Sequence, residues 1–253
     1  MKEIKTYTAL GIMSGTSLDG LDLALCRFKL ENERWSFEIL KAQTFDFDSV
    51  WKQKLEEAYR LSSFDLIRLD KNFGFFIGKK VNAFLTGIPY APDLIASHGH
   101  TVFHQPEKGI TLQIGSGEVI AATSGMQTIS DFRSLDVALG GQGAPLVPVG
   151  DEFLFADYDY CLNLGGFSNI SFKENELRLA YDICPVNIAL NKLYPPFDQD
   201  GNIGRSGNLN KKLLYDLNRL PYYSLPYPKS LGREWFEKEF MAVLLHLDIS
   251  IED

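Results

Sequence analysis

The order of apolar and polar residues predicts a chain that begins with three strands, at residues 6–13, 21–28 and 35–45. A spacing of three to four residues between apolar positions then predicts two helices, at 49–60 and 64–85. Shorter strands are expected at 92–96, 110–114 and 128–130, with a small helix at 117–123. The first half therefore mixes strands and helices, as in an α/β domain.

A glycine-rich stretch at 140–145 is the best candidate for a domain boundary. It suggests one domain at 1–145 and a second at 146–253. After it, strands are expected at 160–164, 168–172 and 177–181. Helices are expected at 186–193, at 209–217 and from about Gly232 onwards. The second half thus begins like the first, with a strand, a glycine-rich turn, two strands and a helix.

Composition narrows the class of protein. The chain has 253 residues, of which 45% are apolar and 23% charged, as in an ordinary globular protein. Its net charge of −8 and the lack of a long basic stripe argue against nucleic acid as a partner. No apolar run is long enough for a membrane span, and residues 1–8 lack the apolar core of a signal peptide. Three widely spaced cysteines predict no disulfide framework, so a cytoplasmic protein is expected.

The turn after the first predicted strand is a candidate phosphate-binding loop. Gly15 and Gly20 allow backbone N–H groups to approach an anion closely, and the hydroxyls of Thr16 and Ser17 add donors. Asp19 could hold Mg²⁺ through water. The Gly-Lys-Ser/Thr ending of a P-loop is absent. A plain hairpin turn with capping hydroxyls explains the pattern equally well.

A second glycine turn, with Gly165 and Gly166, follows the first strand of the second half. Two such hairpins facing each other could clamp a triphosphate in a cleft between the domains. Taken alone, the second one could also be a tight turn that only joins two strands.

Three of the four histidines lie within residues 97–104, where His98 and His100 would share one face of a continuing strand. A zinc site is conceivable, but no cysteine or carboxylate clusters with them. The pattern favours a strand end that presents polar groups to a ligand.

Two further charged residues follow predicted strands. Arg133 could bind a carboxylate or phosphate with two parallel hydrogen bonds, or form a surface salt bridge. Asp182 ends a strand and precedes a helix, so it could cap that helix or act as a general base.

These segments together resemble the anhydro-N-acetylmuramic acid kinase family. The matching stretches, in order along the chain, are GIMSGTSLDGLDLAL, IASHGHTVFHQP, TLQIGSGEVIA, SDFRSLDVALGGQGAPLVP, LNLGGFSNIS, YDICPVN, DQDG and PKSLGRE. The resemblance implies the two-domain actin-like fold of sugar kinases, heat-shock cognate ATPases and actin, with ribonuclease H-like halves. It also implies a reaction of peptidoglycan recycling, in which ATP phosphorylates the 6-oxygen of 1,6-anhydro-N-acetylmuramic acid while water opens the anhydro bridge. The products are N-acetylmuramic acid 6-phosphate and ADP.

The resemblance also assigns roles to residues of this sequence. Asp182 matches the catalytic aspartate that activates water, and Thr101 and Arg133 match segments that line the sugar pocket. The implied cofactors are ATP and Mg²⁺, with Asp19 as the metal ligand; the implied partner is a small amino sugar, and homodimer formation is common in the family. The ATP-phosphate positions are Gly15, Thr16, Ser17, Leu18, Asp19, Gly20, Leu21 and Asp22, joined by Gly165 and Gly166.

The sequence departs from the family pattern in three places. Ile183 and Cys184 replace part of a glycine-rich loop after Asp182, and His100 stands where glutamine is usual. Family members also continue beyond the position of Asp253, so the second domain is expected to be incomplete and to lack the adenosine-binding segment. A truncated, non-catalytic sugar-binding remnant is therefore the alternative to a kinase. A different phosphotransferase or a hydrolase on the same fold is a third reading.

Overall fold

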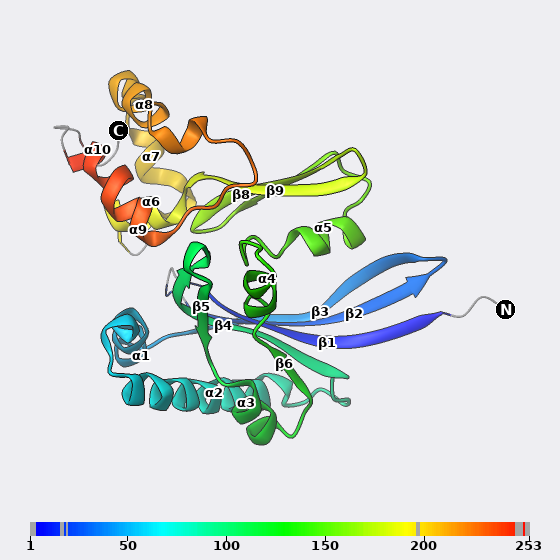
Figure 1. The fold of residues 1–253 in the computed structure, drawn as a ribbon. Coiled ribbons are helices and arrows are strands. Elements are labelled where there is room, and N and C mark those ends of the chain that lie inside the picture. The colour runs from blue at the N-terminus through cyan, green and yellow to red at the C-terminus, as the bar shows by residue number, and fades with distance from the viewer. Residues whose placement is uncertain (1–3, 16–17, 19, 196–197, 246–249, 251–253) are drawn as a thin grey trace. The chain divides into compact units, whose positions relative to one another are not determined.

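A computed structural model describes residues 4–15, 18, 20–195, 198–245 and 250 of the chain. The chain divides into two compact units, residues 1–146 and 147–253, and each contains one β-sheet with helices (Figure 1). The fold is therefore mixed α/β, as the sequence predicts. Within the described residues, no helix is both long and apolar enough to cross a membrane.

The first unit is built on a six-stranded sheet with the order β3-β2-β1-β4-β5, and β6 pairs with β4 beside this path. The pairs β1–β2, β2–β3 and β4–β5 are antiparallel, whereas β1–β4 and β4–β6 are parallel. The strands are β1 Lys5–Ser14, β2 Gly20–Glu31, β3 Arg34–Asp46, β4 Leu94–Gln105, β5 Ile110–Ile114 and β6 Thr128–Ser130. The helices are α1 Ser49–Glu56, α2 Ser63–Leu85, α3 Gly117–Ser124 and α4 Ser134–Ala138, and single 3₁₀ turns lie at Ala58–Arg60 and Pro106–Lys108.

Helix α2 covers one face of this sheet, with α3 alongside it (Figure 1). Ser62 caps its start, because the Ser62 side chain accepts a hydrogen bond from the Asp65 N–H at 3.2 Å. Its buried apolar side chains recur every three or four residues and pack on the sheet; they are Leu69, Phe73, Ile77, Val81 and Phe84. This spacing places them on one face of the helix. The strands contribute buried residues such as Leu10, Leu23 and Ile95 to the same core.

Two glycines of α2 allow α3 to lie close against it. A Cβ on Gly74 would lie 2.7 Å from the Ser116 carbonyl oxygen. A Cβ on Gly78 would lie 2.6 Å from the Thr123 Cβ. Both distances are shorter than real contacts of this kind, so the packing of the two helices requires glycine at these positions.

The second unit has a three-stranded antiparallel sheet with the order β7-β8-β9. Its strands are β7 Tyr160–Leu164, β8 Phe167–Glu174 and β9 Leu177–Pro185. Its helices are α5 Pro148–Leu154, α6 Asn187–Leu193, α7 Asn202–Ser206, α8 Lys211–Asn218, α9 Arg233–Trp235 and α10 Met241–Leu245. Two 3₁₀ turns, Gln199–Gly201 and Pro221–Ser224, and a π turn, Phe236–Phe240, complete the unit.

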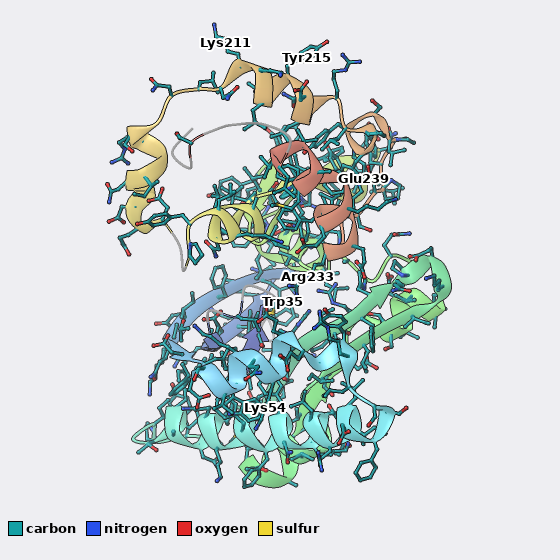
Figure 2. All side chains as sticks on the ribbon, turned by 90° about the vertical axis from the view of Figure 1, so that its left-hand side faces the viewer. Trp35, Lys54, Lys211, Tyr215, Arg233 and Glu239 are labelled. Carbon is teal, nitrogen blue, oxygen red and sulfur yellow. The ribbon has the colours of Figure 1, made fainter. Side chains whose placement is uncertain are left out.

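Helices α6 to α10 gather beside one end of this sheet (Figure 1). Figure 2 shows Lys211 and Tyr215 of α8 on the outer side of this group, directed away from it. The buried residues of this group are Ala189, Leu220, Phe236, Phe240, Met241 and Leu244. Helix α5 packs elsewhere on the sheet, where buried Asp151 accepts a hydrogen bond from the Ser171 hydroxyl at 2.5 Å. The second unit therefore has its own apolar core and a separate polar contact under α5.

The predicted strands and long helices agree with the structure except at a few ends. Strand β4 continues to Gln105, nine residues beyond its predicted end, because its second half pairs with β5. The predicted helix at 49–60 stops at Glu56 and is followed by a 3₁₀ turn. The short helices α4, α5 and α7 were not predicted, since five to seven residues show little periodicity.

Replacing Gly78 by valine should lower the free energy of unfolding by about 1–3 kcal/mol, because the added side chain would overpack the contact with Thr123. The control is Lys79→Val, which introduces the same side chain at the next, exposed position of α2 and should change stability by about 0.5 kcal/mol or less. Both are measured by denaturant unfolding. Equal stabilities for the two variants would contradict the close packing of α2 on α3.

Candidate active site

The first glycine hairpin joins the end of β1 to the start of β2. Thr16, Ser17 and Asp19 lie outside the residues that the structure describes. Leu18 adopts a left-handed conformation, with φ of 58°, and its N–H donates to the Gly15 carbonyl at 3.3 Å. The predicted tight turn is therefore present at its described ends.

The residues after this turn have different environments. A Cβ on Gly20 would lie 2.9 Å from the Phe45 carbonyl oxygen, so this position needs glycine. The Leu21 side chain is fully buried in the core, which leaves only its backbone for a ligand. Asp22 is exposed, and its carboxylate accepts a hydrogen bond from the Thr44 hydroxyl at 2.5 Å.

Parallel pairing of β1 with β4 brings this hairpin next to the histidine segment. Ser14, at the end of β1, is paired with His100, and a hydrogen bond of 3.1 Å joins the Ser14 Oγ to the His100 Nδ1. Both residues are buried. Gly99 has φ of 73°, and a Cβ there would lie 2.6 Å from the Ile114 carbonyl oxygen. Strand β4 continues through this segment, but its backbone is irregular at Gly99, and His98 and His100 have different partners.

Arg133 lies immediately before α4 and is bound to His98. Its Nε and Nη2 lie 3.1 Å and 2.8 Å from the His98 Nε2, and its Nη1 donates to the Gly143 carbonyl. The His98 Nδ1 lies 3.0 Å from the Gly99 carbonyl. With Nε2 accepting from Arg133, His98 is the tautomer that carries its proton on Nδ1. Burial lowers the pKa of His98, and the charge of Arg133 lowers it further.

The glycine-rich stretch after α4 turns back and contacts Asp136, an acidic residue of that helix. Asp136 accepts a hydrogen bond from the Gly143 N–H at 2.6 Å. A Cβ on Gly141 would lie 2.3 Å from the Asp136 Oδ2. The turn thus returns the chain to Arg133, whose guanidinium holds the Gly143 carbonyl. The only signal for Asp136 in the sequence is its position between Arg133 and the glycines at 140–143.

Thr101 lies in β4, one residue after His100, and is half-buried. It pairs with Gln113 of β5, and the register shifts between Thr101 and Phe103. The Gln113 amide donates to the Thr111 hydroxyl at 2.8 Å. Thr101 therefore adjoins a polar stretch of the β4–β5 hairpin.

The second glycine hairpin joins β7 to β8 and contacts the start of α6. The Gly166 carbonyl accepts hydrogen bonds from the Val186 and Ile188 N–H groups at 2.9 Å and 3.1 Å. The Gly165 carbonyl accepts one from the Asn187 N–H at 3.2 Å. These bonds fix the turn against the segment that follows Asp182.

Asp182 lies near the end of β9 and is 7% exposed. It pairs with Asn169, whereas Cys184 pairs with Ser168, so Ile183 is an extra residue in β9. Such a bulge changes the direction of neighbouring side chains and is frequent next to active sites. The Asp182 Oδ2 accepts a hydrogen bond from the Leu231 N–H at 2.8 Å. The helix α6 begins five residues later and takes no cap from Asp182, so the capping role considered for it is not the observed one.

Sequence reasoning missed the segment that surrounds Asp182. The Tyr222 hydroxyl donates to the Asp182 carbonyl at 2.6 Å, and the Asp182 N–H donates to the Lys229 carbonyl at 3.0 Å. Lys229 and Leu231 belong to the stretch PKSLGRE, whose sequence alone indicates no contact with Asp182. Nothing in the sequence around Tyr222 indicates its contact with a residue 40 positions away.

The candidate residues thus form two groups, one in each unit. In the first unit, the β1–β2 hairpin adjoins the segment with His98, His100 and Thr101, and His98 holds Arg133. In the second unit, the β7–β8 hairpin adjoins the bulge beside Asp182. Among the described residues, no group of three or more His, Cys, Asp or Glu side chains could hold a metal ion.

Because the pKa of His98 is lowered in the folded chain, the unfolded chain binds more protons at mildly acidic pH. The contribution of neutral His98 to stability should be fully present above its unfolded pKa of about 6.5 and be lost as the pH falls toward the folded value. Unfolding free energies measured from pH 7.5 to pH 5.5 should fall more steeply for the wild type than for His98→Gln. Identical slopes would show that His98 is not held neutral.

The chain is similar to a known protein family over nearly its whole length. The family model for anhydro-N-acetylmuramic acid kinase matches residues 7–250. An anhydro-N-acetylmuramic acid kinase of Shewanella denitrificans is 39% identical to the chain, over 94% of this chain and 70% of the relative. Relatives of the same name in Shewanella baltica and Vibrio cholerae are 38% and 37% identical, each over 97% of this chain and over 71% and 69% of their own length. The chain therefore belongs to the anhydro-N-acetylmuramic acid kinase family of carbohydrate kinases.

Proposed function

We propose that the chain catalyses ATP-dependent conversion of 1,6-anhydro-N-acetylmuramic acid to N-acetylmuramic acid 6-phosphate, with hydrolytic opening of the anhydro bridge. The observation that carries the proposal is Asp182, a buried carboxylate beside a β-bulge and next to a glycine hairpin, within a family match that spans residues 7–250. Membership of a kinase family implies the use of ATP.

The proposed fold is the actin-like fold of two ribonuclease H-like halves. An N-terminal domain at 1–145 and a C-terminal domain at 146–253 would correspond to it. The support is that each unit contains three consecutive antiparallel strands paired in sequence order, β1-β2-β3 and β7-β8-β9, with a glycine turn after the first of them.

ATP phosphates would bind at the two glycine hairpins, residues 15–22 and Gly165–Gly166. Backbone N–H groups in glycine turns bind anions without a basic surface, which suits a chain with a net charge of −8. Mg²⁺ would be held by Asp19, which lies outside the described residues. The donor chemistry fits, since Asp22 adds an exposed carboxylate at the base of the same hairpin. Mg²⁺ needs only one or two carboxylates besides phosphate and water, and it neutralises phosphate charge when bound.

The sugar would bind near Thr101 and Arg133. The contacts of Arg133 with His98 and with the Gly143 carbonyl orient the guanidinium. An oriented guanidinium suits a planar carboxylate, and the lactyl group of muramic acid carries one.

In the reaction, the Asp182 carboxylate would take a proton from a water molecule as that water attacks the anomeric carbon of the sugar. The bond from this carbon to the bridging oxygen breaks, and the oxygen leaves with its electron pair as the 6-oxygen. This oxygen attacks the γ-phosphorus, and ADP departs. The proton stays on Asp182 until it returns to solvent.

We place this activity in peptidoglycan recycling in the cytoplasm, in a chain able to form a homodimer. The direct test is to incubate the purified chain with ATP, Mg²⁺ and 1,6-anhydro-N-acetylmuramic acid and to follow ADP and N-acetylmuramic acid 6-phosphate by chromatography. ADP formation that depends on the sugar is expected. Calorimetric binding of the sugar without any turnover would instead favour a non-catalytic sugar-binding protein.

Asp182→Asn should reduce turnover by about 10²–10⁴-fold, because the amide keeps the shape of the carboxylate but cannot act as the base. The affinity for the sugar should change much less. Asp151→Asn is the matched control, since Asp151 is also 7% exposed and lies in the same unit, bound to Ser171. It should retain turnover within a few-fold. Comparable rates for wild type and Asp182→Asn would show that the base is another group.

A further inference from the structure

The connection between α8 and α9 runs beside β9 (Figure 1) and surrounds Asp182 with hydrogen bonds. The Asp182 N–H donates to the Lys229 carbonyl at 3.0 Å, and its own carbonyl accepts from the Tyr222 hydroxyl at 2.6 Å. The Leu231 N–H donates to the Asp182 Oδ2 at 2.8 Å. Three polar groups of one residue are thus held by a single connection, whose residues Lys229–Leu231 we call the strap.

The strap also contacts Tyr222 directly, through Lys229. The Lys229 ammonium donates to the Tyr222 and Tyr223 carbonyls at 3.1 Å and 3.4 Å. It also lies 4.6 Å from the centre of the Tyr222 ring and 5.6 Å from that of Tyr181, within the range of cation–π attraction. Tyr222, Asp182 and the strap therefore each contact the other two, in a circuit of three mutual contacts.

Tyr222 is suited to act as a permanent donor in this circuit. It is 4% exposed, and its ring packs against Trp235 at 5.3 Å between centroids. Burial raises the pKa of its hydroxyl, and the charge of Asp182 raises it further. The hydroxyl therefore keeps its proton at physiological pH and donates it to the carbonyl of Asp182.

The strap matters because Asp182 sits at an irregular point of β9. The extra residue Ile183 interrupts the regular pairing with β8, which on its own would leave the direction of the Asp182 side chain loosely defined. Hydrogen bonds to the backbone on both sides of its Cα, and one to the carboxylate, fix that direction. A general base acts efficiently only when it is held within reach of the proton it takes.

We infer that Tyr222 and the strap Lys229–Leu231 are positioning elements for the Asp182 carboxylate. They act through Asp182. The inference rests on the proposed role of Asp182 as the base. It adds the residues that hold the Asp182 carboxylate in its orientation.

The first test needs no turnover and uses the Leu231 amide as a reporter in NMR spectra of the full chain. Asp182→Asn should move the Leu231 amide resonance, because its acceptor loses its charge, and this variant calibrates the reporter. Tyr222→Phe should move the same resonance in the same direction and increase the hydrogen exchange rate of this amide about tenfold or more. Tyr223→Phe is the matched control, because the Tyr223 hydroxyl makes none of these contacts with Asp182, and it should leave the reporter unchanged. An unaltered Leu231 amide in Tyr222→Phe would overturn the inference.

The second test is kinetic and separates positioning from general support of the fold. Tyr222→Phe should lower kcat about ten- to hundredfold while KM for ATP stays the same. In the Asp182→Asn background the same change should lower kcat no further, since it acts only through the base. Lys229→Met removes the ammonium contacts. It should likewise lower kcat in the wild-type background and cause no further loss in the Asp182→Asn background. An equal loss of kcat with and without Asp182 would assign Tyr222 a structural role instead. If Asp182→Asn itself kept full turnover, the proposed base would be wrong, while the Leu231 reporter would still decide whether Tyr222 and the strap hold the carboxylate.

Discussion

The arrangement of the first unit depends on the parallel pairing of β1 with β4. Parallel neighbours end at the same edge of a sheet, so this pairing puts Ser14 beside His100 and the β1–β2 hairpin beside Thr101. The irregular step at Gly99 falls between the Ile12–Ser97 and Ser14–His100 pairs, and only glycine fits its positive φ and its approach to Ile114. Residues almost 90 positions apart thereby come to one edge, where we propose that phosphate and sugar bind.

In the second unit, Asp182 is held in place in a different way. Its sheet brings Asp182 next to the β7–β8 hairpin, but a bulge interrupts the strand at that point, and a distant connection supplies the missing hydrogen bonds. A regular strand would hold the backbone of Asp182 by pairing alone. Because of the bulge, the Asp182 side chain does not follow the regular alternation along the strand. Hydrogen bonds with Tyr222 and the strap give its carboxylate a defined orientation instead. On this account, the rigidity of the base comes from residues 222–231, outside the sheet.

Local pattern was enough to predict most strands and both glycine hairpins, because alternation and turn residues are local signals. It was enough as well to single out Arg133 and Asp182, since charged residues that follow strands are conspicuous. Contacts between distant residues could not be predicted in the same way. The bond of Arg133 to His98 spans 35 positions and that of Tyr222 to Asp182 spans 40. The full length of β4 depended on its pairing with β5, and the short helix α4 on the folding of the glycine turn over Asp136. These features arise from tertiary packing, which overrides weak local preference.

The central claim, from the proposed function, is that the chain couples opening of the anhydro bridge to phosphoryl transfer. It is tested most directly by counting, in one reaction, the moles of ADP formed and the moles of anhydro bridge opened, with a non-transferable ATP analogue as the parallel sample. The account predicts a ratio of one throughout the reaction and no bridge opening with the analogue. Bridge opening without ADP formation, or a phosphorylated sugar that keeps its bridge, would contradict it.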